Sequence, residues 1–166
     1  MHLEESLLAH KSASSVSSDK FWAMIYLIPV YHNPTGRCLS SGACQRILEL
    51  AKRLDILVVC DDVYNLLHYE DSPPPTRLLH RSQSTGATVI SNGSFSKILA
   101  PGMRMGWIES DPVTLSRLAN CGVLNSGGAA NHVMSGVISH ALQSGQLTKH
   151  LLGLKTEYVS TYCCQH

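Results

Sequence analysis

An alternation of short apolar runs with amphipathic stretches constrains the fold more than any other feature. Residues 24–30 and 56–60 are apolar runs of strand length, and each ends at a polar turn. Between them, residues 41–54 carry apolar side chains at helical spacing, and either Ser40 or Ser41 can cap that helix. Strands that alternate with helices form parallel sheets covered by helices. The sequence therefore predicts an α/β fold with a largely parallel sheet flanked by helices.

The second half of the chain continues this pattern. A third strand is expected from Thr88, and residues 103–109 are expected to form a fourth. Helices are predicted over residues 112–120, 133–142 and 147–158. A length of 166 residues without an internal repeat predicts one domain.

Composition and charge exclude several classes of protein. Thirteen basic and twelve acidic residues give a net charge of +1, so no broad basic field is available to bind nucleic acid. The apolar runs are too short to span a membrane. The first twenty residues contain Glu4 and Glu5, lack arginine and have no continuous apolar core, so neither a secretory signal nor a transit peptide is expected.

The cysteines and histidines do not form metal-binding patterns. Six cysteines include no CxxC pair, and nine histidines include no pair at metal-ligand spacing, so we expect no metal site. Without a secretory signal the cysteines are expected to be reduced thiols in a cytoplasmic protein, with Cys60 in the core. Cys163 and Cys164 are expected to lie in a frayed tail.

Polar side chains gather at the strand ends or in the turns that follow them. In open α/β sheets, ligands bind in the crevice beyond the carboxyl ends of the strands. These positions are therefore the candidate site. The side chains concerned are Asn33, Asp61, Tyr64, Ser94, Ser96, Lys97 and Arg104.

The chemistry of these side chains points to one cofactor. A lysine in a crevice can form a Schiff base with a carbonyl group. A carboxylate beside a pyridine nitrogen stabilises the protonated ring. Two hydroxyls and a guanidinium suit a phosphate. Together with amide and phenol donors for a phenolate oxygen, these groups match pyridoxal 5′-phosphate.

Three motifs carry a resemblance to a known family. They are PVYHNPTG at residues 29–36, DDVY at residues 61–64 and SFSKILAPGMRMGW at residues 94–107. In this order they resemble the fold-type I, class I/II aminotransferases, closest to the aminoadipate and kynurenine aminotransferase-like branch. The resemblance runs from about residue 19 to residue 162. It implies that residues 1–166 are part of a three-layer large domain, without the family's N-terminal segment and C-terminal small domain.

The resemblance also assigns roles around the cofactor ring. Lys97 would be the Schiff-base lysine and the base that moves a proton between the substrate Cα and the cofactor. Asp61 would pair with the ring nitrogen, and Asn33 and Tyr64 would hydrogen-bond the ring 3-oxygen. Asp62 is expected to be structural, because the spacing to Tyr64 selects Asp61.

The phosphate would be held by three further side chains. By the same resemblance these are Ser94, Ser96 and Arg104. Ser94 and Lys97 also fit the Ser-x-x-Lys signature of serine β-lactamases, but Pro101 interrupts the helix that this signature requires, and its partner motifs are missing. We reject that alternative. Residues 126–128 are predicted to be either a plain hinge or a segment near a dimer interface.

The function implied by the resemblance is transfer of an amino group between an amino acid and a 2-oxo acid. This places the protein in amino acid metabolism, including biosynthetic reactions, with a homodimer expected for the full-length form. The chain alone is expected to have little activity, because the arginine that binds the substrate carboxylate lies in the missing domain. Two alternatives stay open: a pyridoxal-phosphate-dependent lyase of the same fold, and a non-catalytic fragment that only binds a partner.

Overall fold

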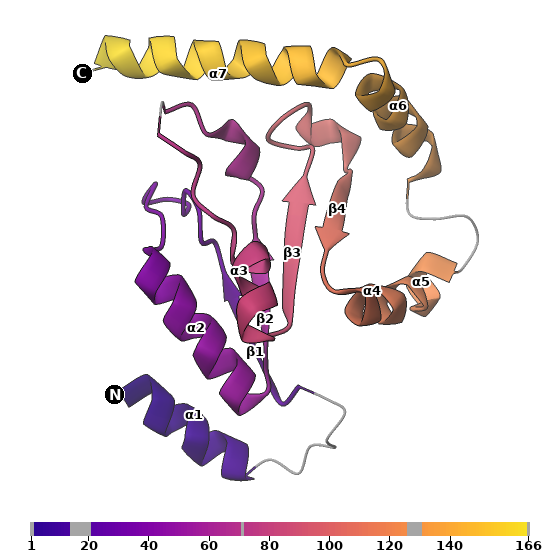
Figure 1. Cartoon of the computed structure of the whole chain (residues 1–166). Coiled ribbons are helices and arrows are strands. Elements are labelled where there is room, and N and C mark those ends of the chain that lie inside the picture. Colours follow the sequence, from indigo (N-terminus) through magenta and orange to yellow (C-terminus); the bar gives the residue numbers. More distant parts are fainter. Residues whose placement is uncertain (1, 14–20, 71, 126–130, 166) are drawn as a thin grey trace.

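The fold is organised around one mixed four-stranded sheet. The computed structural model describes residues 2–13, 21–70, 72–125 and 131–165. Strands β1 (Ala23–Leu27), β2 (Ile56–Asp61) and β3 (Val89–Ser94) are parallel, and β4 (Gly106–Glu109) runs antiparallel to β3. The order is β1-β2-β3-β4, so each strand pairs with its neighbour in sequence (Figure 1).

Helices connect the parallel strands and extend beyond the last strand. Two of them, α2 and α3, provide the crossovers from β1 to β2 and from β2 to β3 (Figure 1). Within the described residues, no helix is both long enough and apolar enough to cross a membrane. The helices are α1 (His2–Ala13), α2 (Ser41–Leu54), α3 (Leu78–Thr85), α4 (Pro112–Ala119), α5 (Gly122–Asn125), α6 (His132–Gln143) and α7 (Gln146–Gln165), with short 3₁₀ turns η1 (Asn65–Leu67) and η2 (Pro101–Met103).

Helix α2 begins and ends where the sequence predicts. The Ser40 hydroxyl oxygen accepts a hydrogen bond from the Ala43 backbone N–H at 3.2 Å, which caps the helix. Asp55, in the left-handed conformation, ends it. The apolar spacing predicts a buried stripe of Ala43, Ile47, Leu50, Ala51 and Leu54. The observed stripe keeps Ala51 and Leu54 but has Cys44 and Leu48 in place of the other three.

The buried side chains form two separate clusters. The larger cluster lies between α2, α3 and one face of the sheet, and it includes Cys60, as predicted. The second cluster packs the loop after β3 against α6 and α7 through Phe95, Ile98, Ile138 and Leu147. The first cluster therefore holds the sheet, and the second holds the loop that carries Lys97.

The two faces of the sheet differ in their cover. Helices α2 and α3 pack on the face that carries Ile56, Val58 and Val89, which we call the covered face. The opposite face, the open face, carries the alternate side chains of each strand. At the end of the sheet where the parallel strands begin, the open face forms a hollow of about 600 Å³ beside α4. The open-face side chains are Met24, Tyr26, Leu57, Val59, Asp61, Ile90, Asn92 and Ile108.

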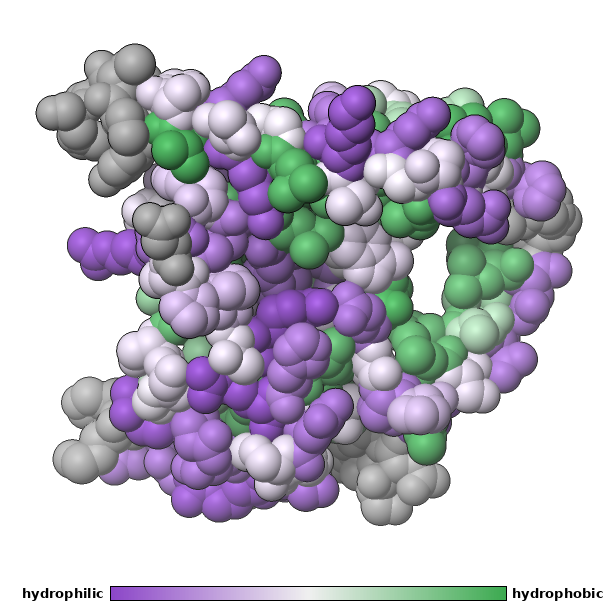
Figure 2. Space-filling view, turned by 45° about the horizontal axis from the view of Figure 1, so that its top comes forward, coloured by the Kyte–Doolittle hydropathy of each residue, from purple (hydrophilic) through white to green (hydrophobic). Residues whose placement is uncertain are grey.

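Apolar side chains also remain exposed away from the sheet. Val123 on α5 and Val133 on α6 are among the most exposed of them. Figure 2 shows an opening through the molecule that is bordered by hydrophobic side chains. The helices after β4 therefore leave much of their apolar surface uncovered.

Several expectations are wrong in detail. Residues 24–30 were expected to be a buried strand, but β1 stops at Leu27, and Met24 and Tyr26 are 62% and 59% exposed. The reason is that β1 is an edge strand whose alternate side chains point to the open face. The prediction of a frayed tail is also wrong, because the backbone of α7 continues to Gln165. Helices α1 and α3 were not predicted.

Candidate functional site

The predicted site residues lie at one edge of the sheet. Asp61 is the last residue of β2, and Ser94 is the last residue of β3. Because β1, β2 and β3 are parallel, their carboxyl ends meet at this edge, where ligands bind in open α/β sheets. The strand pairing thus brings together residues that lie more than thirty positions apart in the sequence.

Asp61 is held by one hydrogen bond to each carboxylate oxygen. The Tyr26 hydroxyl donates to Oδ2 at 2.7 Å, and the Asn92 amide Nδ2 donates to Oδ1 at 3.2 Å. The bond to Asp61 raises the pKa of Tyr26 above its usual value, with smaller contributions from partial burial and from the negative charge of Asp61. Tyr26 therefore stays a neutral donor at physiological pH.

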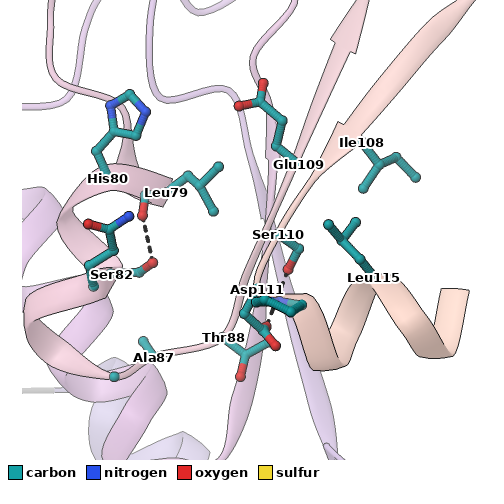
Figure 3. A pocket seen from close by; sticks show the side chains of 13 residues that line it. Leu79, His80, Ser82, Ala87, Thr88, Ile108, Glu109, Ser110, Asp111 and Leu115 are labelled. Atoms are coloured by element: carbon teal, nitrogen blue, oxygen red, sulfur yellow. Dashed lines mark hydrogen bonds between the residues drawn. The ribbon is translucent and has the colours of Figure 1, made fainter.

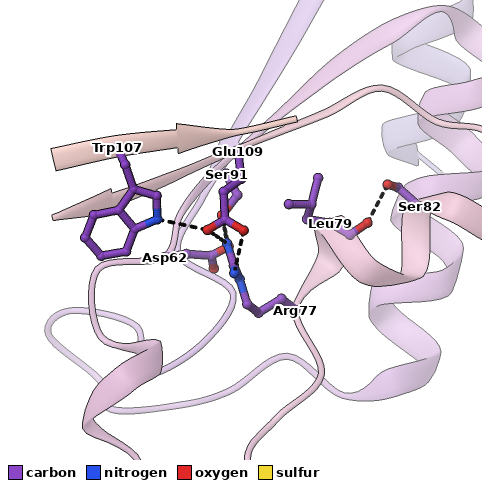
Figure 4. Close-up of polar contacts among 7 residues, drawn as sticks. All are labelled: Asp62, Arg77, Leu79, Ser82, Ser91, Trp107 and Glu109. Atoms are coloured by element: carbon purple, nitrogen blue, oxygen red, sulfur yellow. Dashed lines mark hydrogen bonds and ion pairs between the residues drawn. The ribbon is translucent and has the colours of Figure 1, made fainter. Parts of the chain in front are cut away.

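The neighbouring Asp62 has a different environment. Its side chain is 1% exposed and lies among polar groups on the covered side (Figure 4). The carboxylate oxygen Oδ2 accepts a hydrogen bond from the Ser91 hydroxyl at 2.5 Å and pairs with Arg77 Nε at 3.5 Å. This burial agrees with the expected structural role.

Arg77 links this buried group to β4. Its guanidinium donates two hydrogen bonds to Glu109, at 2.8 and 3.1 Å, in a bidentate pair (Figure 4). The Trp107 indole N–H also donates to Glu109, at 2.9 Å. The hydrogen bonds from Arg77 lower the pKa of Glu109 below its usual value, more than partial burial raises it. This network fastens the end of β2 to β3 and β4 behind the site.

Lys97 stands at the exposed tip of the loop after β3. Phe95 and Ile98 on either side of it are buried in the second cluster, so the loop is anchored while the amine faces outward. The Lys97 Nζ lies 5.8 Å from the centre of the Tyr64 ring. The structure therefore brings together two of the predicted ring-binding residues from separate loops.

Ser94, Ser96 and Arg104 also come together. The Ser94 hydroxyl oxygen accepts a hydrogen bond from the Ser96 backbone N–H at 3.1 Å, and Arg104 Nη1 donates to the Ser96 hydroxyl oxygen at 3.4 Å. Arg104 adopts the left-handed conformation (φ 49°), and the Asn131 amide donates to the Met103 carbonyl at 2.7 Å beside it. Two hydroxyls and a guanidinium thus form one cluster.

A close approach of two strands sets this arrangement. A Cβ added at Gly106 would lie 2.5 Å from the carbonyl oxygen of Gly93 on the paired strand. Only glycine therefore allows β4 to pair with β3 here. This pairing sets where the connecting loop, with Lys97 and Arg104, returns to the sheet.

Asn33 comes from a different segment of the chain than the other predicted site residues. It lies in the exposed turn after β1, at the same edge of the sheet. The turn is closed by a hydrogen bond from the Gly36 N–H to the His32 carbonyl at 2.7 Å, and Gly36 has φ 67°, which favours glycine. Residues 126–128, predicted as a hinge or interface segment, lie outside the described residues.

Sequence reasoning missed Tyr26, Asn92 and Asn131 as neighbours of the site. Tyr26 was concealed in an apolar run, although its spacing places it on the same face as Met24. Asn92 lies two residues before Ser94, and its pairing with Asp61 depends on the register of β2 and β3. A search for polar side chains in the last three residues of each strand could have found both Tyr26 and Asn92.

A separate cavity lies at the other end of the sheet. It has a volume of about 630 Å³ and lies between α3 and the start of α4, with Thr88, the residue before β3, on its wall (Figure 3). It contains none of the predicted site residues.

Among the described residues, no group of three acidic, cysteine or histidine side chains could hold a metal ion.

Comparison with known proteins places this chain in a family. The sequence model of the aminotransferase class I and II family matches residues 19–156. The chain belongs to this family. The fold expected from the resemblance is confirmed, because solved aminotransferases contain the same arrangement of strands and helices.

Two solved structures and one relative show how far this similarity to aminotransferases extends. A kynurenine aminotransferase from Pyrococcus horikoshii, in complex with PMP, is 30% identical with a TM-score of 0.70, covering 93% of this chain and 36% of its own. An α-aminoadipate aminotransferase from Thermus thermophilus, complexed with N-(5′-phosphopyridoxyl)-L-leucine, is 27% identical with a TM-score of 0.67, covering 80% of this chain and 34% of its own. An aromatic-amino-acid aminotransferase from Thermococcus litoralis is 37% identical over 112 residues, which are 68% of this chain and 26% of that protein.

These coverages show how this chain compares in length with the proteins that it matches. It spans about a fifth to a third of the length of the curated relatives that it matches. The matched part contains the candidate site.

Proposed function

We propose that this aminotransferase-family chain binds pyridoxal 5′-phosphate and contributes to amino-group transfer between an amino acid and a 2-oxo acid. The observation that carries the proposal is the joint placement of an amine, a carboxylate and a hydroxyl–guanidinium cluster at one sheet edge. The relatives described above include proteins crystallised with PMP or with a phosphopyridoxyl compound, which supports the choice of cofactor.

The donor set fits the phosphate of this cofactor. Arg104 already donates to Ser96 at 3.4 Å, and the loop between Ser94 and Ser96 presents two hydroxyls beside it. A phosphate accepts hydrogen bonds from hydroxyls, backbone N–H groups and guanidinium together. These three residues would bind and orient the phosphate.

The remaining residues supply the chemistry around the ring. When bound, pyridoxal phosphate supplies a carbonyl that bonds to amines and a ring that takes up electrons from the substrate Cα. Lys97 provides the amine for that bond, and its Nζ would move the proton to and from Cα. Asp61 would hold the proton on the ring nitrogen by its negative charge. Tyr64, beside Lys97, and Asn33 would bind the 3-oxygen.

The site is open, and this limits what the isolated chain can do. Asn33, Lys97 and Arg104 are all exposed, so bound substrate would remain in contact with water. Positioning and exclusion of water contribute much of an enzyme's rate. We therefore expect slow turnover by these residues alone and faster turnover when a second subunit, as in a homodimer, covers the site.

Reductive trapping tests the proposal. The chain is incubated with pyridoxal phosphate, reduced with borohydride, digested and mapped by mass spectrometry. The expected result is one pyridoxyl group per chain at Lys97, lost in Lys97→Arg and kept in the control Lys149→Arg, an exposed lysine on α7. Labelling spread evenly over the lysines would contradict the proposal.

Two further measurements separate the alternatives. With an amino acid and 2-oxoglutarate, transamination yields a new 2-oxo acid and glutamate, whereas a lyase of the same fold yields an elimination product. A chain that is not trapped at Lys97 but that co-purifies with a longer aminotransferase would instead be a non-catalytic partner.

A further inference from the structure

We infer that Tyr26 and Asn92 are positioning residues for Asp61, whose carboxylate they fix in the orientation that meets the cofactor ring nitrogen. The inference rests on the proposed function, in which Asp61 holds the proton on that nitrogen. The structural observation is the pair of hydrogen bonds that reach Asp61 from the strands on its two sides, one to each oxygen.

The sheet register explains why these two residues reach Asp61. Asn92 is the direct register partner of Asp61 across β2 and β3. Tyr26 is the partner of Val59 across β1 and β2, so it is a diagonal neighbour of Asp61 on the same face. Diagonal neighbours are within reach of an aromatic side chain, and the phenol makes the 2.7 Å contact. Both donors therefore come from regular strands, which hold them more rigidly than loops would.

The two bonds leave Asp61 able to bind a further donor. A carboxylate has about four acceptor sites on its two oxygens, and the bonds from Tyr26 and Asn92 use one on each oxygen. A rotation of the carboxylate would break both bonds together. The group is thus fixed in one plane, with acceptor sites remaining for a ring N–H.

The donors are neutral, and this distinguishes Asp61 from Asp62. Asp62 is buried against the Arg77 guanidinium, a cation that it shares with Glu109. Among the described residues Asp61 has no ion-pair partner; a phenol and an amide hold it instead. Neutral donors orient a carboxylate without cancelling its charge, so the charge remains available to stabilise a protonated pyridine ring.

Hydrogen bonds that did not position the Asp61 carboxylate would weaken protonation of the ring nitrogen instead of supporting it. Hydrogen bonds to a carboxylate disperse its charge and weaken its hold on another proton. If dispersal were their main effect, removing them would strengthen protonation of the ring. If they position the carboxylate, removing them weakens protonation. If the two bonds have a purely structural role, removing them leaves the protonation of the ring unchanged. The direction of the change in ring protonation therefore distinguishes positioning, charge dispersal and a purely structural role.

The test measures the protonation of the ring nitrogen directly. The chain is loaded with pyridoxal phosphate labelled with ¹⁵N in the ring, and the ¹⁵N chemical shift is followed against pH. In Tyr26→Phe and Asn92→Ala we expect the midpoint of ring protonation to fall by about 0.5–1 pH unit, and further in the double variant. The control Tyr158→Phe, which changes an exposed tyrosine on α7, is expected to leave the midpoint unchanged.

The outcomes separate this inference from the function on which it rests. A midpoint that rises or stays constant in both variants, with Lys97 still trapped by borohydride, overturns the inference alone. Absence of the Lys97 adduct in the unchanged chain overturns the proposed function and the inference together. Both side chains lie on the open face, so circular dichroism is expected to show folded variants. If one variant fails to fold, the other decides.

Discussion

The covered face and the open face of the same sheet differ in how far their side chains are buried. On the covered face, Ile56, Val58 and Val89 are almost completely buried, and Arg77 contacts the Asp62 and Glu109 carboxylates beside them. On the open face, side chains one position away stay accessible. The alternation of a strand thus separates stability on one face from chemistry on the other.

Two consecutive aspartates show this division most clearly. Asp61 points to the open face and is held by neutral donors, whereas Asp62 is buried and paired with a guanidinium. The two residues have identical side chains and differ only in the face they occupy. We therefore expect substitutions on the covered face to change stability and those at Asp61 to change cofactor chemistry.

Removal of the Arg77 guanidinium is expected to have the largest effect on stability. Arg77→Met leaves the buried carboxylate of Asp62 without its cation, and loss of one partner of a buried pair costs about 4 kcal/mol. Urea unfolding followed by circular dichroism measures the loss. The matched control Arg46→Met, on the exposed face of α2, is expected to change the free energy of unfolding by less than about 0.5 kcal/mol. Equal effects of the two variants would refute the structural importance of the network.

A cavity in the larger apolar cluster is expected to have the next largest effect. Leu48 on α2 is completely buried, so Leu48→Ala should cost about 3 kcal/mol in the free energy of unfolding. Leu66→Ala, at an exposed leucine of η1, is the control and should cost less than about 1 kcal/mol. Similar losses in the two variants would show that the covered face is not the main source of stability.

The Arg77–Glu109 pair predicts how stability depends on pH. The pKa of Glu109 in the folded chain is lowered from its usual value of 4.5, so the stabilisation is fully present above pH 4.5. It is lost as the pH falls through the lowered pKa. Because Glu109 is partly exposed, we expect a contribution of about 1 kcal/mol. Glu109→Gln should be less stable than the unchanged chain at pH 7, and urea unfolding should show that difference disappearing in acid. A difference that is independent of pH would contradict the account.

Substitution of Asp61 is expected to have the smallest effect on stability. Asp61→Asn removes a negative charge from the open face and should change the free energy of unfolding by less than about 0.5 kcal/mol. The same change should lower the pKa of Tyr26 toward 10.0, because the carboxylate that raises it is gone. NMR of ring-labelled tyrosine measures that titration. A large loss of stability, or an unchanged Tyr26 titration, would show that the two faces are not separate.

The sequence was sufficient to predict the elements with clear periodicity. Helix α2 follows from its apolar spacing and its serine cap, and the run at residues 56–60 became the central strand β2. The clustering of Ser94, Ser96 and Arg104, and the contact between Lys97 and Tyr64, were also consistent with the motifs.

Other features could not be predicted, because they depend on pairing between distant segments. The antiparallel direction of β4 is not encoded in its alternation, since side chains alternate in the same way in both kinds of sheet. The Arg77 network joins residues from four separate segments. Tyr26 and Asn92 reach Asp61 only through the register of three strands.

A crystal structure of the chain soaked with pyridoxal phosphate tests the central claim most directly. We predict continuous electron density from Lys97 Nζ to the cofactor, the ring nitrogen about 3 Å from an Asp61 oxygen, and the phosphate against Ser94, Ser96 and Arg104. Density bonded to a different lysine, or a ring nitrogen directed away from Asp61, would contradict the account.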